Sequence, residues 1–196
     1  MIIDARIADV DTAGRPTRTV RAQFGSKLLD ALGIVGPGQR EQVVYLRKMV
    51  DRYRNLMPIR EKAVEIVREA GIPPKAKLAQ AVAIGEWMRR NVYYVNEPEE
   101  TFQTPLRTLR SGFGDCDDFT TLGASLCEGI GIPCQLVGIG VNAPGERLTH
   151  IFPRAIVRHG RRVLKVPLDA TINYPMGTDP IRVAAARGDR VRVFAV

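Results

Sequence analysis

The stretch Gly112-Phe113-Gly114-Asp115-Cys116-Asp117-Asp118-Phe119 decides the fold prediction, because it marks the start of a helix with a cysteine in its first turn. The helical pattern continues through Leu122, Leu126 and Ile130 and is closed by Gly129, Gly131 and Pro133. Small residues and a further cysteine share a face with Cys116 at helical spacing: Thr120, Gly123 and Cys127. Such a strip lets a helix lie close against a sheet, so we expect this helix to pack on one.

Amphipathic helices precede this stretch and strands follow it. Apolar residues recur at helical spacing from Gln39 to Met57, from about Ile59 to Ala70, and from Leu78 to Val92 after Pro73-Pro74. Strand-like segments follow the cysteine helix at residues 134–141, 149–158, 162–168 and 190–195. Helices first and strands afterwards favour an α+β fold in which the cysteine helix packs on an antiparallel sheet.

The predicted domain organisation is one domain behind an N-terminal extension. Residues 1–38 form the extension, which includes a short alternating stretch at 19–24 and has no predicted role. Residues 39–196 form the domain, divided into a helical part (39–95), a core (96–177) and a C-terminal strand segment (178–196).

Composition excludes several classes of protein. The net charge is +8 over 196 residues, but the basic residues are scattered and no aromatic stacking motif accompanies them, so we expect no nucleic-acid partner. No apolar stretch is long enough for a membrane span and no secretory signal opens the chain, which predicts a cytoplasmic protein without a membrane partner. The 3 cysteines are too few for a disulfide framework and are expected to be reduced.

Cys116 is a candidate nucleophile because of its predicted place at a helix N-terminus. Free backbone N–H groups and the helix dipole there favour a thiolate, and the same N–H groups could stabilise an oxyanion. The flanking residues Asp115, Asp117 and Asp118 act in the opposite direction, because their negative charges raise a thiol pKa. An inert buried cysteine remains the alternative.

The chain has only two histidines, and a hairpin argument favours one of them as a base. His159 stands beside Gly160 at a predicted hairpin tip, where it is a solvated turn residue. If His159-Gly160 is the two-residue turn, His150 faces Asp169 across the hairpin, and a carboxylate there can orient an imidazole. Pro153 and Pro167 could shift this register. A zinc site is not expected, because the ligand spacings of such sites do not occur.

Taken together, these residues resemble the transglutaminase-like superfamily, the papain-like branch with a Cys-His-Asp triad. The matching pieces occur in the family's order within about residues 75–175. They are Glu86-Trp87-Met88-Arg89-Arg90-Asn91-Val92-Tyr93-Tyr94, Thr104-Pro105-Leu106-Arg107-Thr108-Leu109, the stretch 112–119, Gly131-Ile132-Pro133-Cys134-Gln135-Leu136-Val137, Thr149-His150 and Leu168-Asp169-Ala170-Thr171. The chain looks most similar to the bacterial transglutaminase-like cysteine proteases.

The resemblance implies a cysteine hydrolase of peptide or side-chain amide bonds, with Cys116 as nucleophile, His150 as base and acid, and Asp169 orienting the histidine. Its substrate would be a protein or peptide. It implies no required cofactor, but calcium bound by some members nominates Asp115 and Asp117 as ligands. Gln103 is the candidate oxyanion-hole side chain.

Two alternatives keep the same fold. A protein-glutamine acyltransferase would use the same triad to cross-link proteins, and a non-catalytic assembly or binding module would retain the fold without the activity. The sequence predicts no oligomeric state.

Overall fold

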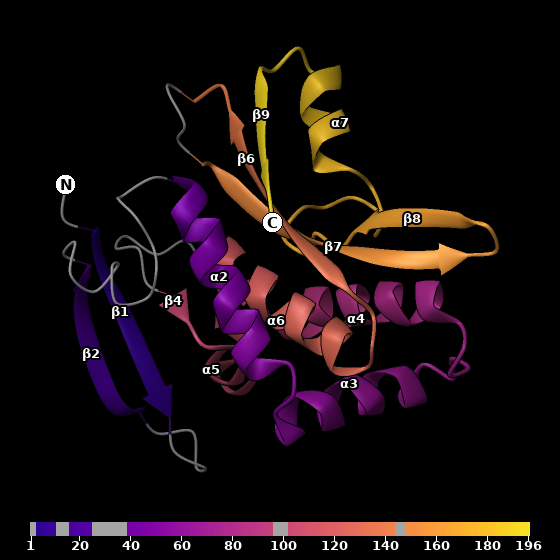
Figure 1. Ribbon diagram of the computed structural model, residues 1–196, viewed down its shortest axis with the longest axis horizontal. Helices are drawn as coiled ribbons and strands as arrows, with labels where there is room; N and C mark the ends of the chain where they lie inside the picture. Colours follow the sequence, from indigo (N-terminus) through magenta and orange to yellow (C-terminus); the bar gives the residue numbers. More distant parts are fainter. Residues whose placement is uncertain (1–2, 11–15, 25–38, 96–101, 144–147) are drawn as a thin grey trace.

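The computed structural model describes residues 3–10, 16–24, 39–95, 102–143 and 148–196 (Figure 1). Its elements are β1 (Ile3–Val10), β2 (Pro16–Phe24), α2 (Gln39–Tyr53), α3 (Met57–Glu69), α4 (Lys77–Asn91), β3 (Tyr93–Tyr94), β4 (Phe102–Gln103), α5 (Pro105–Ser111), β5 (Phe113–Gly114), α6 (Cys116–Gly129), β6 (Cys134–Val141), β7 (His150–His159), β8 (Arg162–Pro167), α7 (Pro180–Ala186) and β9 (Val191–Ala195). In the described part of the chain, no helix is both long and apolar enough to cross a membrane.

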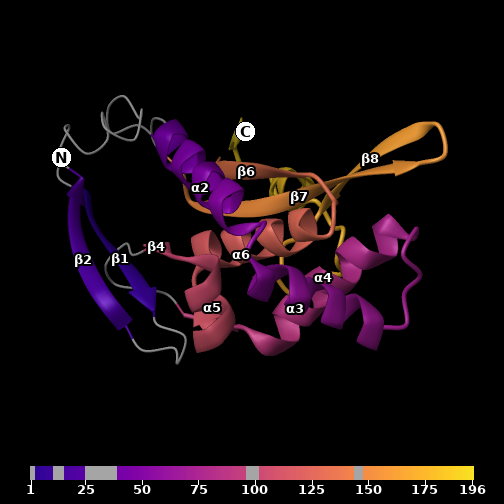
Figure 2. The same ribbon diagram turned by 60° about the horizontal axis from the view of Figure 1, so that its bottom comes forward.

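Helix α6 is the centre of the fold. Figure 2 shows it between the sheet that contains β6 and β7 and the helices α3 and α4. Its residues from Asp117 to Cys127 are all buried, and its apolar side chains Phe119, Leu122 and Leu126 join a core shared with α3, α4 and β7. The predicted α+β fold, with the cysteine helix packed on an antiparallel sheet, is therefore confirmed.

The strip of small residues allows this close packing. The Thr120 hydroxyl lies 3.1 Å from the Ile151 carbonyl oxygen of β7. A Cβ atom at Gly123 would lie 3.0 Å from Met88 Sδ and 3.3 Å from Pro153 Cγ. A larger side chain at Gly123 would thus push α6 away from both the sheet and α4.

The main sheet has the strand order β8-β7-β6-β9, and all its neighbours are antiparallel. The four strands fall within a residue or two of the predicted segments. The face opposite α6 is covered by α7, whose Ile181 packs near Val137, Ile139 and Phe152. Helix α7 was not predicted; the segment 178–196 was expected to contribute only a strand.

The predicted hairpin register is wrong by two residues. The turn between β7 and β8 is Gly160-Arg161 and not His159-Gly160, since His159 pairs with Arg162. Gly160 takes a φ of 59°, the left-handed conformation that a tight hairpin turn requires at its first central position. Continuing the observed register would place Asp169 opposite Phe152, two residues from His150.

Strand β8 leaves β7 before it reaches the histidine. The last pair of the ladder is Arg154 with Pro167, followed by a hydrogen bond of 2.8 Å from Leu168 N to the Pro153 carbonyl. Alternate residues of a strand direct their N–H and C=O groups to the same edge. Ile151, two residues before Pro153, therefore directs these groups to the β8 side of β7, where β8 is no longer present. The N-terminal part of α6 occupies this place, as the Thr120 contact indicates.

Helix α5 was not recognised in the sequence, although its ends carry signals. The Thr104 side chain caps the helix by accepting a hydrogen bond from Arg107 N, Pro105 is the first helical residue, and Gly112 ends it with a φ of 71°. A capping threonine, a first-turn proline and a terminal glycine are typical helix boundaries.

The N-terminal region forms a hairpin of β1 and β2, and β1 also pairs in parallel with β4. Strand β2 includes the alternating stretch predicted at 19–24, whereas β1 was not predicted. The division of the chain into an extension (1–38) and a domain (39–196) stays a prediction.

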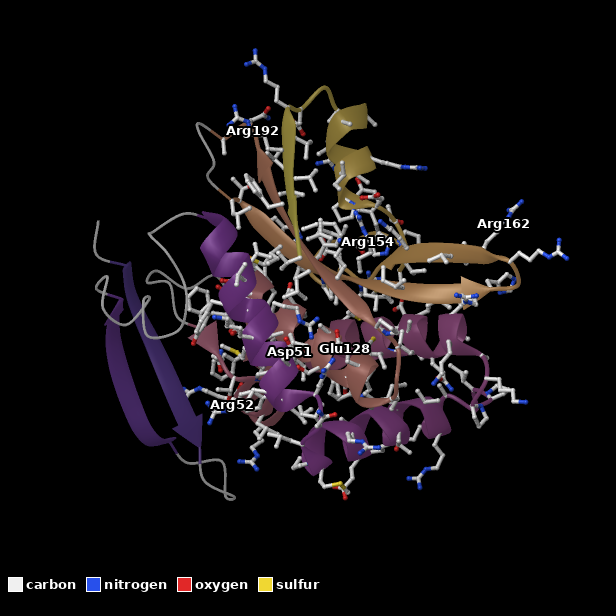
Figure 3. The ribbon with its side chains drawn as sticks, viewed as in Figure 1. Asp51, Arg52, Glu128, Arg154, Arg162 and Arg192 are labelled. Carbon is white, nitrogen blue, oxygen red and sulfur yellow. The ribbon has the colours of Figure 1, made fainter. Side chains whose placement is uncertain are left out.

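A buried carboxylate joins α2 to the C-terminal end of α6. Glu128 accepts hydrogen bonds from Arg47 at 2.6 and 2.8 Å and from Arg54 at 2.8 Å, and its Oε1 atom accepts the Cys134 N–H at 3.2 Å. Figure 3 shows Glu128 close to Asp51, where α2 crosses α6. This cluster fixes the C-terminal end of α6, and the candidate active site lies at its N-terminal end.

Candidate active site

Cys116 is the first residue of α6, and the helix begins with a reciprocal cap. Asp115 accepts the N–H groups of Asp117 (3.0 Å) and Asp118 (3.3 Å), while the Asp118 carboxylate accepts the Asp115 N–H (3.3 Å). The Phe119 N–H bonds to the Asp115 carbonyl at 3.0 Å. The pattern Asp115-x-x-Asp118 is a capping-box signature that was available in the sequence.

This cap leaves one helix N–H next to the sulfur. Among the described residues, the Cys116 N–H has no acceptor outside its own residue, whereas the following three N–H groups are taken. Cys116 itself is half-buried, so its sulfur is not sealed inside the core. The arrangement can therefore supply one backbone donor to an oxyanion formed on the sulfur's substrate.

Asp118 is fully buried and serves the architecture of this corner. Its carboxylate accepts the Gln103 N–H at 2.8 Å and the Gln103 side-chain amide at 2.9 Å, in addition to the Asp115 N–H. Gly114 is required beside it, because a Cβ atom there would lie 2.6 Å from the Asp118 carboxylate. Asp118 thus holds β4 and the loop before α6 in place.

Gln103, the candidate oxyanion-hole residue, is held by hydrogen bonds to its neighbours. Its side-chain Nε2 donates to Asp118 and, at 3.3 Å, to the Phe113 carbonyl, while its Oε1 accepts from Arg107 Nε at 3.1 Å. Both amide hydrogens are therefore used within this corner. The oxyanion-hole role of Gln103 stays a prediction.

His150 and Asp169 are in direct contact. His150 Nε2 lies 2.6 Å from Asp169 Oδ2, and the other carboxylate oxygen accepts the Thr171 N–H at 3.0 Å and its hydroxyl at 2.7 Å. Burial raises the pKa of Asp169, but the hydrogen bond and charge of His150 and the two Thr171 donors outweigh it, so the pKa is lowered overall. The carboxylate stays ionised and fixes Nε2 as the protonated nitrogen.

The contact is made beyond the hairpin ladder. The predicted register placed His150 and Asp169 directly opposite each other, whereas they meet diagonally after β8 has ended. Thr171, for which no role was predicted, holds the Asp169 carboxylate in place, because the β7–β8 ladder does not reach that far.

Cys116 and His150 lie at the same edge of β7. Ile151, the residue after His150, gives a backbone hydrogen bond to the Cys116 sulfur and accepts one from Thr120, a turn later in α6. With Nε2 on Asp169, the imidazole keeps Nδ1 without a hydrogen-bond partner among the described residues. The structure therefore brings His150 and Asp169 together and places Ile151, the residue after His150, beside α6, whereas the triad of Cys116, His150 and Asp169 stays a prediction.

The Cys116 thiol is not the acidic group that its helical position suggested. Burial raises its pKa, the charges of Asp117 and Asp115 raise it further, and the backbone hydrogen bonds lower it only in part. The sulfur lies 3.9 Å from Asp117 Oδ1. These surroundings therefore disfavour the thiolate form of Cys116.

Asp115 and Asp117, the candidate calcium ligands, are used differently. Asp115 is the helix cap, and Asp117 is buried and accepts a hydrogen bond of 3.2 Å from Gln42 Nε2. In the described ranges, no group of three or more histidine, cysteine or acidic side chains is arranged to hold a metal ion. Calcium takes six or more oxygen ligands, backbone carbonyls and water included, so the calcium role of Asp115 and Asp117 stays a prediction.

The remaining candidates have ordinary surroundings. His159 is exposed at the end of β7, as predicted, and Trp87 packs at the margin of the core under Lys62. All three cysteines are free, and Cys127 is buried.

Tyr94 was missed as a site residue. Strand β3 pairs it with Gly114 of β5, and its ring lies 6.2 Å from that of Phe119. Burial raises the pKa of Tyr94, and so do the nearby Cys116 and Asp115. Its phenol is therefore a neutral group at the margin of the site.

One family model matches the chain. The family model described as "Transglutaminase-like superfamily" matches residues 63–162, which are 100 of the 196 residues. No curated protein matches the sequence.

Solved structures resemble the chain in fold. A candidate protease of Parabacteroides distasonis is 14% identical with a TM-score of 0.50, over 74% of this chain and 32% of that one. A candidate cysteine protease of Cytophaga hutchinsonii is 18% identical with a TM-score of 0.48, over 74% of this chain and 50% of that one. Calcium-bound LapG of Legionella pneumophila is 12% identical with a TM-score of 0.40, over 79% and 77% of the two chains. The chain thus spans about a third and half of the first two proteins.

Proposed function

This chain belongs to the transglutaminase-like superfamily, and on that premise we propose that it is a cysteine hydrolase of peptide or side-chain amide bonds. Cys116 is the nucleophile, His150 the base and acid, and Asp169 the residue that orients the imidazole. The observation that carries the proposal is the 2.6 Å contact of His150 with Asp169 beside the β7 edge that receives the Cys116 sulfur.

The first half-reaction transfers the acyl group to sulfur. Because the thiol pKa is raised, His150 Nδ1 takes the thiol proton as the sulfur attacks the amide carbon. The C–S bond forms, and the carbonyl oxygen becomes an oxyanion to which the Cys116 N–H can donate. The imidazolium then gives its proton to the leaving nitrogen as the C–N bond breaks, leaving a thioester.

The second half-reaction releases the acyl group. A water molecule loses a proton to His150 Nδ1 and attacks the thioester carbon, and the C–S bond breaks as the sulfur regains the proton. Throughout, Asp169 keeps Nε2 protonated and stabilises the imidazolium, while Thr171 holds the carboxylate. No step involves calcium.

The proposal is tested with fluorescein-labelled unfolded casein and with the Cys116→Ala variant. We expect the wild-type protein to release labelled fragments and Cys116→Ala to release none while keeping the circular dichroism spectrum of the wild type. Equal release by both proteins would contradict the proposal. Adding calcium or EGTA should leave the rate unchanged, because the acidic side chains beside Cys116 are used by the protein itself.

The second candidate function is transfer of the acyl group to an amine instead of to water. It uses the same thioester, so incubation with casein as glutamine donor and a fluorescent primary amine distinguishes the two reactions. We expect fragments without incorporated dye. Dye incorporation that depends on Cys116 would instead identify an acyltransferase, and neither product would leave a non-catalytic module.

A further inference from the structure

The two-stranded sheet of β3 and β5 carries exposed aromatic and apolar side chains beside the candidate site. Tyr93 is 76% exposed, Val95 41% and Phe113 40%. Tyr93 and Phe113 are paired residues of adjacent strands and therefore lie on the same face, and Val95, two residues after Tyr93, extends that face. Three large apolar side chains thus form one continuous exposed surface.

The outer edge of β3 has unused backbone groups. Tyr93 N donates to the Gly112 carbonyl at 2.8 Å and Val95 N to the Gly114 carbonyl at 2.9 Å, so both point toward β5. Tyr94 lies between them and directs its N–H and C=O to the opposite edge. Neither group has a hydrogen-bond partner in the part of the chain that the structure describes.

The sheet of β3 and β5 lies beside the candidate nucleophile. Tyr94 pairs with Gly114, two residues before Cys116, and its ring contacts Phe119 in the first turns of α6. Tyr94 therefore lies on the face of β3 turned toward Cys116, and the surface of Tyr93, Val95 and Phe113 lies on the other face. A strand added to β3 would alternate its side chains between these two faces.

We propose that an extended polypeptide substrate adds to the outer edge of β3, with an aromatic or branched apolar side chain on the surface of Tyr93, Val95 and Phe113. This inference rests on the proposed function and names its substrate class. Addition of a strand to an open sheet edge provides main-chain hydrogen bonds, and the apolar surface selects alternate side chains. A small or compact amide would use neither feature.

The test measures the alkylation of Cys116 by peptidyl chloromethyl ketones, with site-resolved mass spectrometry. Acetyl-Phe-Gly chloromethyl ketone should react about tenfold faster than acetyl-Gly-Gly chloromethyl ketone, because part of the phenyl ring becomes buried. In the Tyr93→Ser/Phe113→Ser double variant the ratio should fall to about one. Iodoacetamide, which has no side chain to bind, should alkylate Cys116 at the same rate in both proteins.

Val163→Ser is the matched control. Val163 is 57% exposed but pairs with Arg158 near the β7–β8 turn, at the opposite end of β7 from His150. This variant should keep the tenfold ratio. Methylating each amide nitrogen of the phenylalanine reagent in turn should slow one of the two methylated reagents severalfold, since one N–H pairs with the β3 edge.

The outcomes separate the two proposals. A wild-type ratio near one, a ratio that survives the double variant, or no effect of either methylation would overturn the docking of a strand on β3 and leave the nucleophile untouched. If iodoacetamide shows no preference for Cys116, the proposed function fails, and this inference fails with it.

Discussion

The sulfur of Cys116 lies 3.9 Å from Asp117 Oδ1. The two residues that follow Cys116, Asp117 and Asp118, are both buried acids. This neighbourhood determines how the cysteine can react. A helix N-terminus normally favours a thiolate, but here the cap is Asp115, and its charge and that of Asp117 oppose ionisation. The mechanism that we propose therefore has His150 take the thiol proton during attack, so that the sulfur is not ionised beforehand.

Replacing Asp117 by asparagine should make the thiol more acidic. The substitution removes a negative charge beside the sulfur, so the Cys116 pKa should fall. We expect the alkaline rise in iodoacetamide alkylation to move to lower pH, measured in a His150→Ala background where no imidazole interferes. An unchanged or higher midpoint would show that Asp117 does not set the thiol pKa.

The Asp169→Asn variant should lose stability in a pH-dependent way. The folded pKa of Asp169 is lowered, so its stabilising contribution is complete above the unfolded pKa of about 3.9 and is lost as the pH falls through the folded value. The deficit of the variant in urea unfolding should be larger at pH 7 than at pH 3.5. A deficit that is the same at both pH values would contradict the ionised pairing with His150.

The same variant should also react more slowly. An asparagine cannot stabilise the imidazolium, and it permits the wrong tautomer of His150. We expect kcat on casein to fall by about 100-fold or more, with little change in KM. Activity within a few-fold of the wild type would remove Asp169 from the proposed triad.

At the scale of elements, the site depends on α6 being fixed at both ends. Asp118 and the cap hold its start, and Glu128 holds its end to α2 and to the first residue of β6. Between them, Thr120 and Gly123 set the helix against β7. Strand β8 ends at Pro167, so the edge of β7 at Ile151 has no neighbouring strand. The candidate site lies at this part of β7.

Glu128→Ala should destabilise the protein by about 3 kcal/mol, because the mostly buried Arg47 would keep only the more exposed Asp51 as a partner and the Cys134 N–H would lose its acceptor. Asp51→Ala is the control: Asp51 also bonds Arg47, but its side chain is 48% exposed, so its loss should cost under about 1 kcal/mol. Chemical denaturation measures both. Equal losses would contradict the role of Glu128 as the anchor of α6.

At the scale of the whole molecule, local patterns predicted most of the fold. Apolar periodicity located α2, α3, α4 and α6, and alternation located the four strands of the main sheet, because these elements contribute apolar side chains to the core at regular intervals. The short helices α5 and α7 bury few residues and are defined mainly by their caps, which periodicity does not detect.

The candidate site was predictable in its residues but not in its geometry. A helix-tip cysteine, two histidines and a hairpin were enough to select Cys116, His150 and Asp169. The turn position and the end of β8 depend on tertiary packing, so the expected register was wrong although the two residues meet. The engagement of Gln103 with Asp118 and the pairing of Tyr94 with Gly114 result from contacts between separate segments of the chain.

The most direct test of the account is the rate of iodoacetamide alkylation at each cysteine, resolved by mass spectrometry, in the wild type and in His150→Ala at pH 7. We predict that Cys116 reacts at least tenfold faster than Cys127 and Cys134, and that His150→Ala abolishes this preference. Equal reactivity of the three cysteines, or a Cys116 rate that does not depend on His150, would contradict the claim that the imidazole activates the helix-tip sulfur.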